Sequence, residues 1–536
     1  MTTQTDPSTP EPTAETTADD GRLDKSVLIV AGVVVLGAIM SILDITVVSV
    51  ALQTFQQEFD ATAAQVAWTM TGYTLALATV IPLTGWAADR FGTKRLYLLA
   101  VTLFTLGSVL CAMADSLQML VAFRVLQGLG GGMLMPLGMT ILTRAAGPDR
   151  VGRVMAIMGI PMLLGPIFGP IVGGWLIDNA SWHWIFLINL PIGILAIVYA
   201  TIVLPKDHVE PSESFDFVGM LLLSPGLASF LYGVSSIPQA KEEHGTPWTF
   251  EVVSTMVLGA VLLVAFVPWA LRKANIHPLV ELRLLKNRDM TVALIAMSLF
   301  AMAFFGASLL FPLYFQQVRS EDALGAGLLM APQGFGAMIT MPIAGLLVDK
   351  IGPGKIVMTG VTVITIGMGL FTMVEADTPY WRLMLALFIM GLGMGATMMP
   401  IMTAALATLT DHNIARGSTL LNIQQQVAAS IGTALFSVIL TEQFSGYPVI
   451  GQLRALFGLT GGSEDPEVVG QAAAELGIDP ASIGQLTADA QLAMADSFAT
   501  VFAVATGLVA CVLIPAFFLP RHKAEKPVDP TVLAGH

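Results

Sequence analysis

The sequence is poor in charged residues. Asp, Glu, Lys and Arg make up only 12% of its 536 residues, whereas about a quarter of an ordinary soluble protein is charged. Hydrophobic residues account for 55% of the chain. This composition excludes a typical soluble globular enzyme. Because about 20 apolar residues make one membrane-crossing helix, the apolar content suffices for roughly fourteen crossings. It therefore indicates an all-α polytopic membrane protein.

Cysteine is nearly absent as well. Cys111 and Cys511 both lie in apolar runs, so the sequence has neither a disulfide framework nor a CxxC metal motif. It also lacks the phosphate-binding pattern G-x-x-x-x-G-K-[ST] and any Ser/His/Asp, Cys/His or metal-spaced cluster. We therefore expect no enzyme, no direct use of ATP, no metal and no organic cofactor. We also expect no nucleic-acid partner.

Fourteen apolar runs have the length of a membrane span. They lie at residues 27–50, 66–86, 96–114, 118–142, 154–177, 184–204, 216–236, 250–271, 289–315, 324–348, 355–374, 382–408, 417–441 and 496–519. One connection is long, and its Ala-rich parts beginning at Pro466 and Pro480 predict surface helices. The sequence before the first run is polar and acidic and predicts a disordered tail.

Basic residues mark one side of the expected bundle. Of the 25 Lys and Arg residues, 20 lie in segments on the side of the N-terminus, four lie on the other side, and Arg124 lies within a span. Basic connections are retained in the cytoplasm. We therefore expect a multi-pass protein of the cytoplasmic (inner) membrane with both termini in the cytoplasm.

An internal repeat divides the chain. The loop Gly85–Arg95 after the second span matches Gly345–Lys355 after the tenth, 260 positions later. Gly128–Pro136 in the fourth span is echoed by Gly391–Pro400 in the twelfth at nearly the same spacing. A duplicated six-span half is the build of transporters that rock two halves around a site at the membrane midplane.

The spans and the repeat together predict five regions. These are a disordered cytoplasmic tail at 1–25, a six-helix half at 26–205, two linker transmembrane helices with loops at 206–285, a second six-helix half at 286–519 with a long extracytoplasmic loop at 442–495, and a cytoplasmic tail at 520–536.

Four motifs give the chain a family resemblance. Leu43–Leu52, Gly85–Arg95, Arg124–Gly128 and Gly159–Gly174 resemble motifs of the major facilitator superfamily, and within it of the fourteen-span drug:proton antiporters of the EmrB/QacA type. The resemblance extends over about residues 27–519. It implies the major facilitator fold and a secondary active transporter that is driven by the proton gradient.

Two charges lie inside spans of the first half. Asp44 is the only carboxylate well inside one of these spans, and Arg124 is the only cation inside any span. A charge in hydrocarbon costs several kcal/mol unless it is paired or hydrated. At 1.5 Å per residue, Asp44 lies about 12 Å and Arg124 about 9 Å from the same surface. We expect one network in which Asp44 takes up protons and Arg124 tunes that uptake, as the resemblance also implies. A static ion pair is the alternative.

The fifth span is crowded with glycine and proline. Small residues let helices approach closely, and prolines interrupt the helical hydrogen bonds. We interpret this pattern as an antiporter motif that forms a gating and leak-sealing surface. Ordinary membrane packing is the alternative. The motif comprises Pro161, Gly165, Pro166, Gly169, Pro170, Gly173 and Gly174.

The repeated basic loops predict a gate. Their charges are expected to lock the inner ends of the two halves together, with a role in topology alone as the alternative. The residues assigned to the gate are Gly85, Asp89, Arg90, Gly92, Lys94, Arg95, Asp349 and Lys350.

Aromatic, methionine and amide side chains suggest a substrate cavity. Methionine-rich surfaces repack around different ligands, and polar groups within a span usually face a cavity or another helix. Ordinary packing or lipid contact is the alternative. The residues assigned to the cavity are Phe305, Phe311, Tyr314, Met399, Asn422 and Gln425.

These features together predict a proton-coupled multidrug efflux antiporter that works by alternating access. Its partners are small amphipathic substrates, protons and membrane lipids. One alternative is a dedicated exporter of a lipid or an endogenous metabolite. An alternative of another class is a non-transporting receptor or scaffold that docks a partner through residues 442–495.

Overall fold

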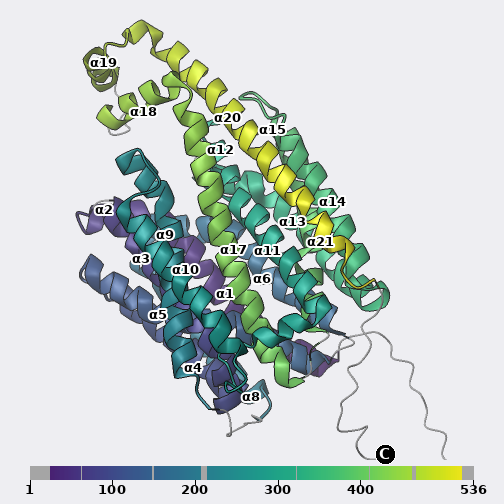
Figure 1. Cartoon of the computed structure of the whole chain (residues 1–536). Coiled ribbons are helices and arrows are strands. Elements are labelled where there is room, and N and C mark those ends of the chain that lie inside the picture. The colour runs from purple at the N-terminus through teal and green to yellow at the C-terminus, as the bar shows by residue number, and fades with distance from the viewer. Residues whose placement is uncertain are drawn as a thin grey trace, which may run out of the picture.

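The computed structural model describes residues 24–61, 63–147, 150–206, 214–321, 323–407, 409, 411–460 and 466–521. Throughout these ranges the regular structure is helical (Figure 1). The tail expected at 1–25 lies outside them up to residue 23, and the tail expected at 520–536 lies outside them from residue 522.

The first half is formed by the helices that precede residue 205. They are α1 (Lys25–Val50), α2 (Leu52–Glu58), α3 (Ala63–Phe91), α4 (Thr93–Ala112), α5 (Leu117–Ala146), α6 (Val151–Asn179), α7 (His183–Leu187) and α8 (Asn189–Val203). Within this half, α5 packs against both α3 and α4, and α1 packs against α6 and α8.

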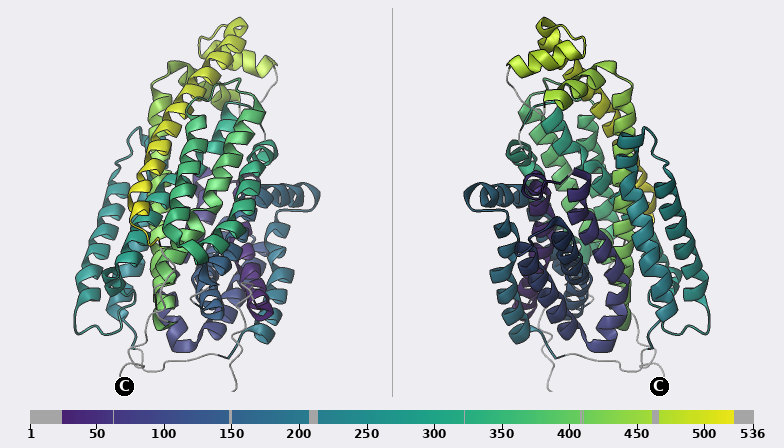
Figure 2. Two further views of the ribbon diagram at one scale, coloured as in Figure 1. Left: turned by 90° about the vertical axis from the view of Figure 1, so that its right-hand side faces the viewer. Right: turned by 90° about the vertical axis from the view of Figure 1, so that its left-hand side faces the viewer.

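Two inserted helices follow, and we call α9 (Phe217–His244) and α10 (Phe250–Leu271) the linker pair. They pack against each other, and α9 also contacts α3 of the first half and α17 (Asp411–Ser445) of the second. Figure 2 shows the linker pair in teal on one flank of the bundle. The short 3-10 helix η2 (Leu282–Lys286) leads from the linker pair into the second half.

The second half repeats the first and extends it. It consists of α11 (Arg288–Ser308), α12 (Leu310–Gln317), α13 (Ala323–Ile351), α14 (Pro353–Phe371), α15 (Tyr380–Gly395), α16 (Met398–Leu406), α17, α20 (Ile483–Cys511) and α21 (Leu513–Phe517). Between α17 and α20 lie α18 (Pro448–Thr460), α19 (Pro466–Glu475) and the 3-10 turn η3 (Pro480–Ser482). The surface helix expected from Pro466 is thus α19, and the one expected from Pro480 is η3 continued by the start of α20.

Thirteen helices of the described residues are long and apolar enough to cross a membrane. The sequence predicts fourteen spans, and the run not included in this count is 154–177. That run lies in α6, which has 29 residues. Several of its side chains, those of Pro166 and Pro170 included, lie outside the described residues.

The duplicated loops have the same backbone conformation. Gly92 precedes α4 with φ 92° and ψ 145°, and Gly352 precedes α14 with φ 83° and ψ 156°. Residues that carry a side chain rarely adopt a positive φ of this size, so both loops need glycine at this position. The repeat found in the sequence is therefore a repeat of structure as well.

The bundle has two distinct ends. The end that carries Asp89, Arg144, Arg153 and Arg416 is called the basic end, and the opposite end, which carries α18 and α19, is called the loop end. Figure 1 shows α18 and α19 above the rest of the bundle and the basic end below. The two halves meet where α13 and α16 pack against α6, and where α17 packs against α3 and α5.

Candidate functional site

A buried ion pair lies inside the first half. Arg124 Nη1 on α5 is 2.5 Å from Asp44 Oδ2 on α1, and the two residues are 1% and 2% exposed. Asp44 precedes the end of α1 by two turns, and Arg124 follows the start of α5 by two turns. Because the two helices run in opposite directions, these positions reach the same depth. The two side chains therefore meet in one polar network, and the roles of Asp44 in proton uptake and of Arg124 in tuning it stay predictions.

Two amides and a hydroxyl surround the carboxylate. Gln127 Nε2 donates to Asp44 Oδ1 and to Ser108 Oγ, each at 2.7 Å. Asn189 Nδ2 lies 3.4 Å from Asp44 Oδ1 and 3.3 Å from Ser108 Oγ. All four residues are buried. The charge on Asp44 is therefore balanced by one cation and solvated by two amide donors, which Ser108 holds in place as a shared acceptor.

Other groups hold Arg124 from the far side. Its Nε donates to Thr69 O of α3 at 3.1 Å, and its Nη1 donates to Gln127 Oε1 at 2.7 Å. The guanidinium carbon lies 4.2 Å from the centre of the Tyr73 ring and 5.9 Å from that of Phe186. A cation over an aromatic face is stabilised by the ring's quadrupole. Arg124 thus has partners that do not depend on Asp44.

Gln127, Ser108 and Asn189 are members of this network that we did not predict from the sequence. One signal for Gln127 was available, because a residue three positions after Arg124 lies on the same helix face. Ser108 and Asn189 are isolated polar residues in apolar helices, and nothing in their spacing indicates which helix they face.

The basic end carries a second charge network. Asp89 at the end of α3 lies 3.5 Å from Arg144 of α5 and 3.4 Å from Arg416 of α17. Arg416 also lies 3.6 Å from Glu281, which precedes η2. The contact between Asp89 and Arg416 joins the two halves. Of the residues assigned to the gate, Asp89 is therefore the one at the centre of this network.

The repeat of Asp89 also bridges the halves. Asp349 at the end of α13 forms an ion pair at 3.2 Å with Arg153 of α6 and accepts a hydrogen bond from Gly152 N at 3.1 Å. The backbones of α6 and α13 also approach closely here, because a Cβ on Gly152 would lie 2.9 Å from Gly345 O. From the sequence we used Arg144, Arg153 and Arg416 only to predict which side of the membrane their segments face, because basic residues at span ends are common.

The remaining gate residues have varied surroundings. A Cβ on Gly85 would lie 3.1 Å from Thr419 Oγ1 of α17, so Gly85 permits close contact between the halves. Lys94 Nζ donates to Thr201 O and Leu204 O, each at 2.7 Å, within the first half. The side chains of Arg90, Arg95 and Lys350 are half-buried or exposed.

The glycines of α6 form a face against α1. A Cβ on Gly165 would overlap Ile42, one on Gly169 would overlap Thr46, and one on Gly173 would lie 3.1 Å from Val47. Gly174 is different, because a Cβ there would meet nothing within 4 Å. Pro161 of the motif is buried.

This face lies beside the buried network. Thr46 Oγ1 donates to Gly165 O at 3.1 Å, which fixes α1 against α6 two residues after Asp44. The glycines therefore let α6 pack closely on α1, and their role as a gating and leak-sealing surface stays a prediction.

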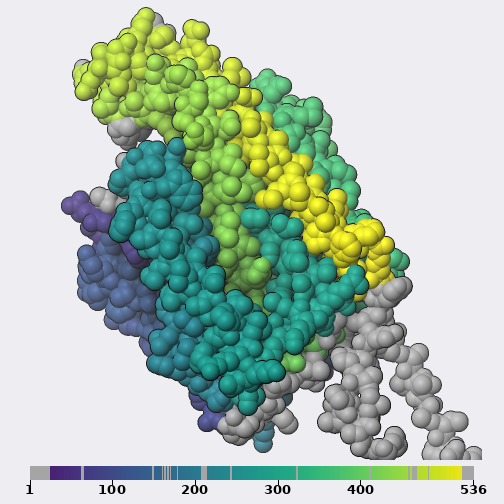
Figure 3. All heavy atoms as spheres, viewed as in Figure 1, coloured from purple at the N-terminus to yellow at the C-terminus, as the bar shows by residue number. Residues whose placement is uncertain are grey.

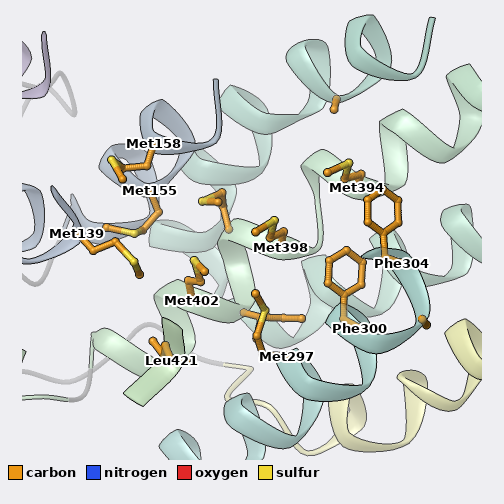
Figure 4. Close-up of a cluster of buried hydrophobic side chains, with 14 of the residues drawn as sticks. Met139, Met155, Met158, Met297, Phe300, Phe304, Met394, Met398, Met402 and Leu421 are labelled. Atoms are coloured by element: carbon orange, nitrogen blue, oxygen red, sulfur yellow. The ribbon is translucent and has the colours of Figure 1, made fainter. Parts of the chain in front are cut away.

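Methionines fill the boundary between the halves. We call this cluster the methionine seam, and all its members are buried (Figure 4). They are Met139, Met155 and Met158 of the first half and Met341, Met398, Met399 and Met402 of the second. A Cβ on Gly159 of α6 would overlap Met341 and lie 3.3 Å from Met399 Cγ. Across the same boundary, Asn422 Nδ2 is 3.3 Å from Met139 Sδ.

The six residues assigned to the cavity do not form one group. Met399 and Asn422 lie at the seam. Gln425 and Phe305 are half-buried on α17 and α11. Phe311 packs against Phe371 and Phe502.

Tyr314 packs against Phe498 and donates a hydrogen bond to Glu375 O at 2.8 Å. Tyr314 and Phe311 thus belong to an aromatic cluster inside the second half. This position differs from the cavity wall that the sequence analysis expected.

Comparison with known proteins places the chain in a family. The model described as Major Facilitator Superfamily matches residues 34–433. A multidrug resistance protein B homolog of Mycobacterium tuberculosis is 49% identical over 510 residues, which cover 94% of this chain and 92% of the relative. The multidrug export protein EmrB of Haemophilus influenzae is 33% identical over 443 residues, with coverage of 78% and 83%.

A solved structure supports the same fold. The human organic anion transporter MFSD10 superposes with a TM-score of 0.57 at 14% sequence identity, over 90% of this chain and 99% of that chain. This chain belongs to the Major Facilitator Superfamily and is a membrane transporter of that family, not an enzyme.

Proposed function

We propose that this transporter exports amphipathic compounds of varied structure in exchange for protons. The observation that carries the proposal is the ion pair between Asp44 and Arg124, buried inside the first half with a complete set of polar partners. A buried intramembrane carboxylate is costly and is therefore a functional site by default. The names of the relatives, a multidrug resistance protein B homolog and a multidrug export protein, support a drug cargo.

Asp44 is the proton acceptor in this proposal. Its carboxylate holds Arg124, Gln127 and Asn189 through charge-assisted contacts. A proton on Asp44 removes the negative charge that attracts Arg124. Arg124 then keeps only uncharged partners, among them Thr69 O and the Tyr73 ring. Because a buried cation without a counter-ion is unfavourable, one proton both weakens the contact between α1 and α5 and favours a rearrangement around Arg124.

Helix α6 transmits this change to the boundary between the halves. Near the loop end its glycines pack on α1 beside Asp44, and near the basic end Gly152 and Arg153 touch α13. A rearrangement of α1 therefore alters the support of a helix that is itself part of the boundary. Coupling of this kind needs an element with two arrangements, and α6 contacts both α1 beside Asp44 and α13 at the basic end.

The methionine seam is the cargo surface in this proposal. Methionine side chains are flexible and polarisable, so they adapt to ligands of different shape. Asn422 adds one polar group at this place, and Met399 lies against α6. The seam consists of methionines, and this uncharged lining suits neutral or singly charged amphiphiles.

The proposal places the basic end in the cytoplasm. The Lys and Arg bias of the connections supports this orientation, with both termini inside and α18 and α19 outside. The expected membrane is the cytoplasmic (inner) membrane. The proton gradient supplies the energy.

Dye efflux in everted membrane vesicles tests the proposal. Vesicles energised by a pH gradient are expected to move a fluorescent amphipathic dye, and a protonophore or Asp44→Asn is expected to stop this movement. Asp60→Asn is the matched control, because Asp60 is exposed at the loop end of the same half and its positive φ is one that Asn tolerates.

Full proton-driven transport by Asp44→Asn would contradict proton coupling through this residue. Absence of dye movement in the folded wild type would favour the alternative of a lipid or metabolite cargo. Deletion of residues 448–482 tests the scaffold alternative: transport that persists while a bound partner is lost would make docking a separate role of this segment.

A further inference from the structure

Arg416 is shared by two carboxylates from different parts of the chain. Its Nε lies 3.4 Å from Asp89 Oδ2 of α3, and its Nη1 lies 3.6 Å from Glu281 Oε2. Arg416 and Asp89 are each 5% exposed, and Glu281 is 8% exposed. Arg144 lies 3.5 Å from the other oxygen of Asp89. The charges of these four buried or partly buried residues therefore alternate in sign.

Glu281 belongs to neither repeated half. It follows the linker pair and precedes η2, where its side chain accepts a hydrogen bond from Arg283 N at 3.3 Å. Only a few residues separate it from the start of α11 at Arg288. Glu281 is thus tied by the chain to the second half, which also carries Arg416.

Opening of the basic end separates these partners unequally. Asp89 and Arg144 both lie in the first half, whereas Arg416 and Glu281 lie on the side of the second half. Movement of the halves away from each other breaks the contact between Asp89 and Arg416, whereas the contacts of Asp89 with Arg144 and of Arg416 with Glu281 can persist. Glu281 also lies 3.8 Å from Arg283 of η2. An isolated buried charge is strongly unfavourable, and a charge that keeps one partner is much less so. Each side can therefore separate with its carboxylate still paired.

We propose that Glu281 is the partner that neutralises Arg416 whenever the basic end is open. The linker segment then sets the balance between the closed and open arrangements, and is more than a spacer between the halves. This inference rests on the alternating access of the proposed function, but it requires neither proton coupling nor any particular cargo.

The two carboxylates on Arg416 should act in opposite directions. Asp89 contacts Arg416 only when the basic end is closed, so Asp89→Asn destabilises the closed arrangement. Glu281 contacts Arg416 when the basic end is closed and stays on the same side as Arg416 when it opens. Glu281→Gln therefore costs more in the open arrangement and favours the closed one. A residue that merely clamped the closed gate would give the sign of Asp89→Asn instead.

Distances between spin labels test this difference. Labels at Phe91 and Ile351, which are 50% and 41% exposed at the ends of α3 and α13, report the separation of the halves at the basic end. The full-length protein is studied in lipid nanodiscs, with the exposed Cys511 replaced by Ser and the buried Cys111 retained.

Opposite shifts are expected for the two main variants. Glu281→Gln should increase the ratio of short to long distances on the order of tenfold, and Asp89→Asn should decrease it. Glu281→Asp keeps the charge and should resemble the wild type. Glu251→Gln is the matched control, because Glu251 lies on α10 and contacts Tyr232 rather than Arg416. All variants are compared by size-exclusion chromatography, and Glu281→Asp reports on the site if Glu281→Gln does not fold.

A shift of Glu281→Gln toward long distances, or no shift while Asp89→Asn responds, would overturn the inference. A Glu281→Asp variant that matches an unfolded or fully closed protein would do the same. If the wild type shows a single short distance that no variant changes, the basic end does not open, so the alternating access of the proposed function fails and the inference fails with it. The two failures are therefore distinguishable.

Discussion

Thr140 Oγ1 of α5 lies 3.0 Å from Ser418 Oγ of α17, and this hydrogen bond joins the two halves where both residues are at most 1% exposed. The bond lies near the basic end, in the same part of α17 as Arg416. It is uncharged, so it contributes to closure independently of the ionic network.

Loss of this hydrogen bond should favour opening of the basic end. A net hydrogen bond contributes about 0.5–1.5 kcal/mol, so Ser418→Ala should shift the ratio of closed to open forms about two- to tenfold toward open. The spin-label pair at the basic end measures this ratio. Ser445→Ala, at the exposed loop end of the same helix, should leave it unchanged. A closed population that grows in Ser418→Ala would contradict the expected contribution.

Removal of Arg124 should destabilise the protein strongly. Arg124→Met leaves the carboxylate of Asp44 buried without its cation, which typically costs about 3–5 kcal/mol in the free energy of unfolding. Adding Asp44→Asn removes the unpaired charge and should restore part of this loss. Thermal unfolding in detergent micelles measures stability, and we expect it to decrease from the wild type to the double variant to Arg124→Met.

An exposed arginine provides the control for this series. Arg272→Met, in the connection after α10, should stay within about 0.5 kcal/mol of the wild type. A double variant that is less stable than Arg124→Met would show that the two residues do not act as a pair.

A methyl group on the glycine face of α6 should make the membrane leaky. Gly169→Ala introduces a Cβ that overlaps Thr46, so α6 must move away from α1 beside the buried network. We expect faster decay of a pH gradient in vesicles without cargo and lower dye efflux. Gly174→Ala adds the same methyl group in open space and should preserve both properties. Equal effects of the two variants would rule out a role specific to this face.

Exchange of seam methionines should alter cargo range more than stability. Leucine has nearly the same volume as methionine but less flexibility, and such swaps usually cost less than about 1.5 kcal/mol. Met398→Leu with Met402→Leu should change the KM values of a panel of dyes by different factors. Met368→Leu, buried in α14 within the second half, should change all of them equally or not at all. Uniform changes in the seam variant would argue for packing alone.

Much of this architecture is predictable from periodicity and repeats. The loop motif around Gly92 and its copy around Gly352 predict a duplication, and both glycines have the same positive φ. Depth along antiparallel helices predicts the meeting of Asp44 and Arg124, because 1.5 Å per residue is a fixed geometric quantity. Such inferences succeed because they depend on one helix at a time.

Contacts that depend on the rotation of a helix were not predictable in the same way. Glu281 lies in the connection between two expected spans, where acidic residues are ordinary, and its contact with Arg416 depends on how α17 lies beside this connection. Phe311 was expected to line a cavity, yet it faces Phe371 and Phe502. Apolar side chains suit a cavity, a core and lipid equally well, so composition alone leaves this choice open.

The position of the linker pair makes the two flanks of the transporter unequal toward the bilayer. On one flank α9 lies against both α3 and α17, and Figure 3 shows the teal linker pair beside the green of α17. Ser224 Oγ donates to Thr79 O, and Lys241 Nζ lies 2.8 Å from Glu442. Lipid acyl chains on this flank contact the linker pair instead of the junction between the two halves. On the other flank α6 and α13 meet without such a cover from the described part of α9. The linker pair therefore gives the transporter a front and a back in the plane of the bilayer.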